Sequence, residues 1–386
     1  MPLTRLAQRA GSTPFYVCDR AVLNQTVHTL KALLPKELAV LYAIKANPMP
    51  ALVGHMAGLV DGFDVASAGE LQLALNGGMR AGQIVFSGPG KTDAELLQAL
   101  AAAVTVNVES VSELKRLMAL AQQWAFEPGV MLRINPDFML QSSGLAMGGG
   151  AGPFGIDAEQ IGDVLALLHG FGVQSAGLHI YAGSQSLSAT AIIDAQTRSC
   201  DLILALAQNS RLEINRINLG GGFGIPYFPG QQALDMPAVA GHLHRCVQRL
   251  KLAWPQARIE IESGRYLVGE AGIYVTRVID KKYSRGKCFL VTDGGLNHHL
   301  AVTGNFGQTL RKNYPVVVGN RIAATSTELA TVVGPLCTPL DVLADQMALS
   351  HAEVGDLIVV FQSGAYGLCA SPVGFLSHGP AVEMLV

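Results

Sequence analysis

The sequence predicts a (β/α)8 barrel joined to an antiparallel β domain, and three observations lead to this α/β fold class. Short, apolar, β-branched runs recur through the first two thirds of the chain, and helix-like segments separate them. Strands that alternate with helices pair in parallel through crossover connections. After Arg265 the helical periodicity fades, and strand-like runs continue between Gly, Pro and Asn turns, as in an antiparallel β domain.

Eight runs form the predicted barrel strands. Most of them are almost continuously apolar, as expected for strands that are covered on both faces. Eight strand–helix units in about 240 residues have the size of a closed barrel, and a doubly wound open sheet is the alternative. In chain order the runs are 39–44, 60–65, 83–86, 104–108, 130–134, 173–180, 214–219 and 258–261.

Three predicted helices between these strands begin with a capping box. In this motif a hydroxyl accepts from a backbone N–H while a Glu three residues later reaches back to the cap residue. The cap residues are Ser67, Thr92 and Ser110, and the helices are predicted over 68–76, 94–102 and 111–123. Each box comes directly after a strand, which supports the alternating pattern.

The second domain is predicted from four strand-like runs and one short helix. A short helix is expected over 340–348. The segment 13–18 is also strand-like, and it is a candidate to join this domain in space. The strand-like runs cover 273–279, 288–292, 356–361 and 381–385.

Composition excludes several classes of function. The chain has 27 Lys and Arg against 29 Asp and Glu, so it lacks the basic surplus of a non-specific nucleic-acid binder. No apolar run approaches the ~18–20 residues of a membrane span, and residues 1–10 lack an export signal core. The 6 cysteines have neither paired nor zinc-ligand spacing, so we expect a cytoplasmic protein with reduced thiols and no metal site.

Lys45 closes the first predicted strand, and the carboxyl ends of the strands are where barrel enzymes place their chemistry. Desolvation at the end of an apolar strand lowers the pKa of a lysine, which makes Lys45 a candidate amine nucleophile. The alternative is a lysine at the strand edge whose ammonium reaches solvent.

The run Gly220–Gly224 follows the seventh predicted strand and suits a backbone cradle for phosphate, because glycine permits close approach. Ser184, after the sixth strand, is a candidate donor to the same phosphate. The alternatives are an ordinary tight loop and a turn serine. The run is not a dinucleotide fingerprint, because Pro226 and Tyr227 stand where a helix should begin.

Glu262, at the end of the eighth strand, forms a simple ion pair with Arg265 in one reading. In the other reading, a carboxylate facing a pyridine nitrogen keeps that nitrogen protonated and makes the ring an electron sink. An amine, a phosphate cradle and an acid for a ring nitrogen together describe a site for pyridoxal 5'-phosphate (PLP). Tyr181 is then a candidate to lie flat on the ring, or else an aromatic side chain at the barrel rim.

In these residues the chain resembles the group III (alanine racemase-like fold) PLP-dependent decarboxylases, which include ornithine and diaminopimelate decarboxylases. The resemblance covers nearly the whole chain and implies a lyase of amino-acid metabolism. The motifs that carry it are 42–47, 179–185, 220–224, 262–265, 334–337 and 364–366.

The resemblance implies a PLP-binding barrel over residues 20–270 and a β domain over 271–386 that residues 1–19 complete. It also implies that Lys45 forms the aldimine with the cofactor and that Cys337 donates a proton from the other subunit of a homodimer with shared active sites. By the same resemblance Glu262 pairs with the ring nitrogen. The implied cofactor-binding residues are Lys45, Tyr181, Ser184, Gly221, Gly222, Glu262, Ser263, Gly264, Arg265 and Tyr366, of which Ser184, Gly222, Arg265 and Tyr366 hold the phosphate.

The chain departs from the family pattern in three places. Tyr181 stands where the family usually has a histidine. Thr338, the predicted substrate-binding residue after Cys337, stands where enzymes for diamino acids have an acidic residue. The Arg-x-x-x-Tyr substrate clamp of diaminopimelate decarboxylases is not found in 297–300. The sequence looks closer to a branch with exosortase-associated and carrier-protein glutamyl decarboxylases.

We therefore expect α-decarboxylation of an amino acid or of an aminoacyl group bound to an acyl carrier protein. One alternative is an alanine-racemase-like racemase, which would place an arginine at the ring nitrogen, so Glu262 argues against it. The other is a catalytically inactive regulator that binds a decarboxylase subunit. The presence of Lys45, Glu262 and Cys337 together argues against a regulator.

Overall fold

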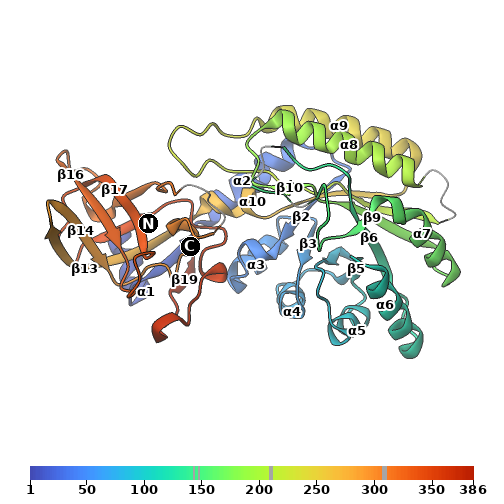
Figure 1. Cartoon of the computed structure of the whole chain (residues 1–386), viewed down its shortest axis with the longest axis horizontal. Helices are drawn as coiled ribbons and strands as arrows, with labels where there is room; N and C mark the ends of the chain where they lie inside the picture. Colours follow the sequence, from blue (N-terminus) through green and yellow to red (C-terminus); the bar gives the residue numbers. More distant parts are fainter. Residues whose placement is uncertain (142–143, 147, 208–211, 307–310) are drawn as a thin grey trace. The chain divides into compact units, whose positions relative to one another are not determined.

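The computed structural model describes residues 1–141, 144–146, 148–207, 212–306 and 311–386 (Figure 1). The chain divides into two compact units. The first, which we call the barrel unit, consists of Gln25–Ile225 and Ala233–Gly264. The second, which we call the β unit, consists of Met1–Asn24, Pro226–Gln232 and Arg265–Val386.

The barrel unit contains a closed ring of parallel strands, as the sequence predicts. Closure is direct, because β12 pairs with β2 on one side and β5 pairs with β6 on the other. These pairings exclude the open doubly wound sheet. The ring strands are β2 (Leu38–Ala43), β3 (Gly62–Val65), β4 (Ile84–Phe86), β5 (Thr105–Val108), β6 (Gly129–Asn135), β9 (Ser175–Ile180), β11 (Glu213–Asn218) and β12 (Arg258–Ser263).

Apolar side chains fill this ring. Leu41, Val85 and Met131, from three different strands, form one fully buried cluster, which is why the predicted runs are nearly continuous in hydrophobicity. Three short strands lie outside the ring: β8 (Ile156–Asp157) pairs in parallel with the end of β6, and β7 (Leu145–Ala146) pairs with β10 (Gly183–Ser184).

Helices connect the barrel strands, and α8 and α9 pack side by side (Figure 1). Thr92 forms the complete capping box at the start of α5. The predicted boxes at Ser67 and Ser110 are only half formed, because Glu70 and Glu113 accept from the N–H groups of Ala66 and Glu109 instead. The connecting helices are α2 (Arg20–Leu33), α3 (Pro50–Ala57), α4 (Ala68–Asn76), α5 (Asp93–Ala101), α6 (Val111–Trp124), α7 (Ile161–Gly170), α8 (Ala189–Ala207) and α9 (Met236–Ala253).

The β unit is built on a mostly antiparallel sheet. The N-terminal strand β1 (Phe15–Cys18) pairs with β13 and with β19, which confirms that the segment predicted over 13–18 belongs to this unit. Phe15, Val17, Val275 and Val359 pack in its core. The other elements are α1 (Leu3–Ala10), α10 (Arg265–Val268), β13 (Gly272–Ser284), β14 (Lys287–Thr292), β15 (Val316–Val318), β16 (Thr327–Val333), β17 (Val342–Ser350), β18 (Leu357–Val360) and β19 (Val382–Leu385).

The helix predicted over 340–348 is wrong, because this segment forms strand β17, which pairs with β16. The register of that pair shifts between Ala330 and Val332, and again before Val333. Such bulges break the two-residue alternation of a strand. Leu343 and Ala344 are consequently both buried, and the apolar positions fall at helix-like spacing.

Among the helices of the described residues, none is both long and apolar enough to cross a membrane.

Candidate active site

The structure places the predicted site residues in two groups. In the barrel unit they stand at or just after the carboxyl ends of the strands, which we call the rim. This group comprises Lys45 after β2, Tyr181 after β9, Ser184 in β10, Gly221 and Gly222 after β11, Glu262 and Ser263 in β12, and Gly264 after β12. The β unit holds Arg265, Cys337, Thr338 and Tyr366.

Lys45 stands in a one-turn 3-10 helix (Ile44–Ala46) that directly follows β2. Its Nζ lies 3.2 Å from Oδ2 of Asp64, the partner carboxylate in β3. Asp64 is buried, but 45 % of the Lys45 side chain is exposed. The expected desolvation of Lys45 is therefore wrong, and its ammonium is instead paired with a buried carboxylate at the rim.

Glu262 is a buried carboxylate surrounded by donors and cations. Its Oε1 lies 3.6 Å from Nε2 of His179, and its Oε2 accepts from Asn218 at 3.4 Å. Burial alone would raise the pKa of Glu262, but the contact with His179 and the charges of Lys45 and Arg133 outweigh burial and hold the pKa below its usual range. Glu262 is therefore ionised at neutral pH, as an acid that keeps a ring nitrogen protonated must be.

The pKa of Asp64 is shifted in the opposite direction to that of Glu262. Burial raises the pKa of Asp64, and the charge of Glu262 raises it further, while Lys45 and the hydrogen bond from Ser87 partly offset both. Ser87 donates to Oδ1 of Asp64 at 2.6 Å. Two carboxylates at one rim whose pKa values are driven apart are typical of a site with divided roles.

The glycine run after β11 is pressed against neighbouring backbone. A Cβ atom at Gly221 would overlap the carbonyl oxygen of Glu262, and one at Gly222 would overlap that of Gly183. Gly222 also has a φ of +85°, which disfavours other residues. Glycine at these positions is thus required by packing, and this packing brings the loop's backbone to the rim beside Glu262.

In the β unit, Arg265 lies among tyrosines. It donates to Tyr227 Oη at 2.7 Å, and its guanidinium lies 4.6 Å from the ring centre of Tyr366. Its Nε is buried and has no hydrogen-bond partner among the described residues. Within the β unit Arg265 therefore keeps a donor for an anion.

Cys337 and Thr338 lie in a turn that Asp341 holds together. The buried carboxylate of Asp341 accepts from the N–H of Leu296 at 2.6 Å and from that of Leu336 at 2.8 Å. Both of its oxygens are thus engaged within the β unit. The turn leaves Cys337 exposed.

The segment 297–300 does not offer a substrate clamp. Asn297, His298 and His299 are all buried. His298 contacts the carbonyl oxygen of Gly379 at 2.8 Å through Nε2, and His299 contacts Ser363 at 3.0 Å. These side chains are part of the interior of the β unit.

Sequence reasoning did not assign four polar side chains of the rim: Asp64, Ser87, Asn107 and His179. All four are buried. The signal that could have found them is a polar residue at the end of each apolar strand, the same signal that identifies Lys45 and Glu262.

PLP fits the residues that are present. The rim offers an amine on Lys45 and an ionised carboxylate on Glu262. It also offers a glycine loop whose Cβ positions are closed to other residues. In the β unit, the buried Nε of Arg265, which has no hydrogen-bond partner among the described residues, suits an anion such as the phosphate.

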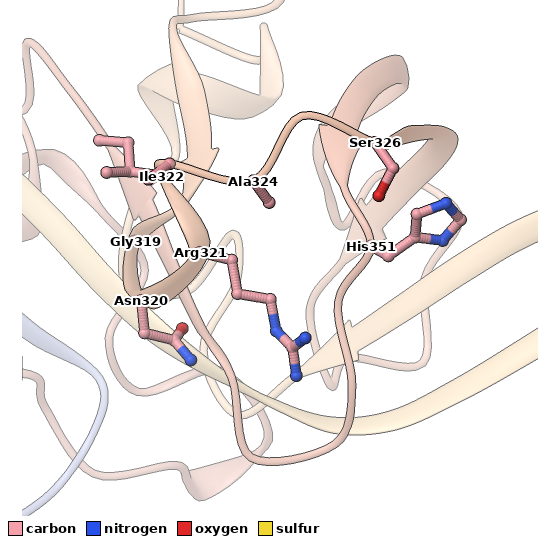
Figure 2. A pocket seen from close by; sticks show the side chains of 8 residues that line it. Gly319, Asn320, Arg321, Ile322, Ala324, Ser326 and His351 are labelled. Carbon is pink, nitrogen blue, oxygen red and sulfur yellow. The ribbon is translucent and has the colours of Figure 1, made fainter.

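A cavity of about 390 Å³ in the β unit is a separate feature (Figure 2). It is lined by Arg321, Ser326 and His351, among others, and contains none of the predicted site residues. Arg321 is engaged by Asp356. Nothing in its lining matches the chemistry of the rim.

Comparisons with known proteins agree with this description. The family model described as "Pyridoxal-dependent decarboxylase, pyridoxal binding domain" matches residues 20–269. The chain is 36 % identical, over 99 % of its length and 90 % of the relative's, to an L-glutamyl-[BtrI acyl-carrier protein] decarboxylase of Niallia circulans. It is 32 % identical, over 96 % of its length and 86 % of the relative's, to a diaminopimelate decarboxylase of Archaeoglobus fulgidus.

A solved structure is similar over almost the whole chain. The diaminopimelate decarboxylase from Helicobacter pylori, complexed with L-lysine, has a TM-score of 0.89 at 26 % identity, and the match covers 99 % of this chain and 94 % of the other.

Proposed function

The chain belongs to the family of pyridoxal-dependent decarboxylases, and from this premise we propose that it removes the α-carboxyl group of an amino acid whose distal end carries no free ammonium. A glutamyl group bound to an acyl carrier protein is such a substrate, and it is the one named for the relative from Niallia circulans. Within the family, the substrate is set by the pocket around the reacting centre, because the cofactor chemistry is shared.

PLP supplies covalent capture of the substrate amine and a ring that accepts the electrons left when CO2 departs. Lys45 is the proposed lysine for the cofactor, and Asp64, 3.2 Å from its Nζ, orients that amine and balances its charge. Glu262 stays ionised, so it can keep a proton on the ring nitrogen. Ser263 and Gly264 follow Glu262 at the end of β12 and are also proposed to bind the cofactor. Tyr181 is proposed to stack on the ring.

The proposed phosphate ligands are Ser184, the backbone of Gly221 and Gly222, Arg265 and Tyr366. Support comes from the glycine loop beside Glu262 and from the Nε of Arg265, which lacks a hydrogen-bond partner in the part of the chain that the structure describes. Cys337 is proposed to protonate the α-carbon from the partner subunit of a homodimer. Its exposure in the single chain supports that role.

The observation that carries the substrate proposal is the engagement of Asp341. Thr338 offers a hydroxyl where diamino-acid enzymes of the family have an acidic residue, and Asp341 is the nearest carboxylate along the chain. Since both oxygens of Asp341 bind backbone N–H groups, it does not replace the missing acid. An unpaired buried ammonium costs on the order of 3–5 kcal/mol, which disfavours a diamino substrate a hundredfold or more.

A substrate panel tests this proposal. CO2 release is followed with ornithine, lysine, diaminopimelate, free glutamate and carrier-bound glutamate. We expect kcat/KM below about 10⁴ M⁻¹ s⁻¹ for all three diamino acids. A value at or above that range for any of them contradicts the proposal.

The variant Thr338→Asp and its control Thr338→Ser extend the test. The aspartate variant restores a carboxylate for the distal ammonium, so we expect it to raise kcat/KM for at least one diamino acid. The serine variant keeps a neutral hydroxyl, so we expect no such gain.

A further inference from the structure

A chain of buried polar side chains joins the two carboxylates of the rim. Ser87 donates from its hydroxyl to Asp64 at 2.6 Å, and Nδ2 of Asn107 lies 3.2 Å from the Ser87 oxygen. The same Nδ2 lies 2.6 Å from Nδ1 of His179, whose Nε2 lies 3.6 Å from Glu262. Five strands or strand ends contribute one group each, and each of the five side chains is at least nine-tenths buried.

The contact between His179 Nε2 and Glu262 is longer than a hydrogen bond, and the direction of the three shorter contacts follows from Asp64. Asp64 faces the Lys45 ammonium at 3.2 Å, and a carboxylate in such an ion pair only accepts, so the single hydroxyl hydrogen of Ser87 points to Asp64 and the Ser87 oxygen is left to accept. Asn107 must then present its amide nitrogen, the donor end, to Ser87. The second hydrogen of that nitrogen points at Nδ1 of His179, which has to be a lone pair.

The two other states of His179 conflict with this arrangement. A proton on Nδ1, in the neutral ring or in the imidazolium, would face the donor nitrogen of Asn107 at 2.6 Å. Flipping the Asn107 amide would relieve that clash. However, Ser87 would then face an acceptor on both sides with one hydrogen, and either Asp64 or Asn107 would lose its bond.

We propose that Asn107 is a positioning residue that fixes His179 as the neutral imidazole with its proton on Nε2, so that Glu262 meets an N–H. The other named neighbours of Glu262 are also donors or cations: Asn218, Lys45 and Arg133. The ring of Tyr181, 6.4 Å from that of His179 between centroids, adds no charge. The opposite tautomer would set a lone pair against a buried carboxylate.

The consequence for catalysis rests on the proposed function. With Nε2–H toward it, Glu262 stays ionised and oriented, and it can hold the ring nitrogen in its protonated form. Asn107 touches neither substrate nor cofactor in this scheme and acts through His179. Outer hydrogen-bond partners of this kind typically change activity by about 10- to 100-fold when removed.

The test measures the tautomer directly. Nitrogen-15 NMR of the holoenzyme labelled at histidine distinguishes a ring nitrogen that carries hydrogen from one that does not, and His179→Gln identifies the signals of His179. We expect hydrogen on Nε2 and none on Nδ1 near neutral pH. A ring with hydrogen on Nδ1, or on both nitrogens, overturns the proposal without any further variant.

Variants give the second readout. Asn107→Asp presents an acceptor to Nδ1, so we expect hydrogen to move there and kcat/KM to fall about 10- to 100-fold. Ser87→Ala, a smaller change, should leave the amide of Asn107 free to flip and should populate both tautomers. Unchanged His179 signals in both variants overturn the proposal.

Asn215→Asp is the matched control. Asn215 lies in β11, and its side chain donates to Ser175, the first residue of β9, away from the rim. We expect unchanged His179 signals and unchanged kcat/KM. The same spectra on the apo-protein keep the two proposals separable, since the tautomer is measured whether or not any substrate of the panel is decarboxylated.

Discussion

Lys45 combines two features: its ammonium is paired with a carboxylate at the rim, and its side chain is half exposed. Lys91, by contrast, is buried and paired with Glu113, and also bonds to two carbonyl oxygens, so its ammonium is fully committed. Lys45 is half exposed beside the carboxylate of Asp64. A lysine that is paired with a carboxylate and also reaches solvent can exchange its partner for a cofactor.

We predict that Lys45→Ala abolishes turnover and covalent attachment of the cofactor. The measurement is borohydride reduction of the holoenzyme followed by peptide mass spectrometry, which should find the cofactor on Lys45. Lys31→Ala is the control, because it removes a comparable ion pair, with Asp61, outside the rim. Cofactor attached to another lysine would show that Lys45 has been wrongly assigned.

At the residue scale, the sequence predicts those rim residues that carry a charge at the end of an otherwise apolar strand. A lysine and a glutamate at the ends of apolar strands are visible as exceptions. Asn107 is not, because its importance depends on closure of the ring, which brings β5 and β9 to either side of β6. No spacing along the chain expresses that neighbourhood.

The glycine loop after β11 gives a prediction at the scale of the element. Gly221→Ala should destabilise the barrel unit by several kcal/mol, on the order of a severe overpacking, since the new Cβ would overlap the backbone of Glu262, which cannot rotate away. Thermal unfolding of the variant, followed by circular dichroism, measures the loss.

Gly241→Ala is the matched control for that loop. Gly241 lies within α9, where an added Cβ meets nothing within 4 Å. We expect a neutral or slightly stabilising effect, because alanine favours helix over glycine by about 1 kcal/mol. Equal unfolding temperatures for the two variants would mean that the loop yields more easily than its packing indicates.

His299 gives the β unit a built-in sensitivity to acid. Burial lowers the pKa of His299 to about 3, whereas an unfolded histidine titrates near ~6.5. Between these values the unfolded chain binds a proton that the folded chain does not. Stability is therefore full above about pH 6.5 and falls as the pH drops toward 3, by up to ~1.4 kcal/mol per pH unit.

We predict that His299→Gln makes the urea midpoint of the β unit less dependent on pH between about 6.5 and 4. His244→Gln is the control, because His244 is exposed. Within the described residues, the hydrogen bond of its side chain is to a backbone carbonyl, that of Leu33. An equally steep pH dependence in His299→Gln and the unchanged protein would assign the acid sensitivity to other groups.

The incorrect prediction of a helix over 340–348 has a physical cause in how strand β17 pairs with β16. Strand prediction relies on a two-residue period, and the register shifts opposite Ala330 to Val333 remove it. Gln346 also has a positive φ of 47°. The barrel strands are covered on both faces, so their prediction does not depend on alternation, and their predicted ends differ from the structure by two residues at most.

At the scale of the whole molecule, the proposed homodimer predicts complementation. Lys45 lies in the barrel unit and Cys337 in the β unit, and in the proposal each site takes them from different chains. Mixing Lys45→Ala with Cys337→Ala should restore up to about a quarter of the sites if subunits exchange at random.

The control for that experiment is a mixture of two preparations of the same variant, which should stay inactive. Native mass spectrometry of differently tagged chains establishes that mixed dimers have formed. Mixed dimers without regained activity would place both residues of a site in one chain.

The position of β1 between β13 and β19 also governs the order of events during synthesis. At about 5–20 residues per second, the ribosome makes β19 roughly 20–70 s after β1. Every strand of the barrel is completed within that interval, because β2 to β12 all precede β13. The barrel can thus form on the nascent chain, while β1 waits with both edges open until its two partners emerge.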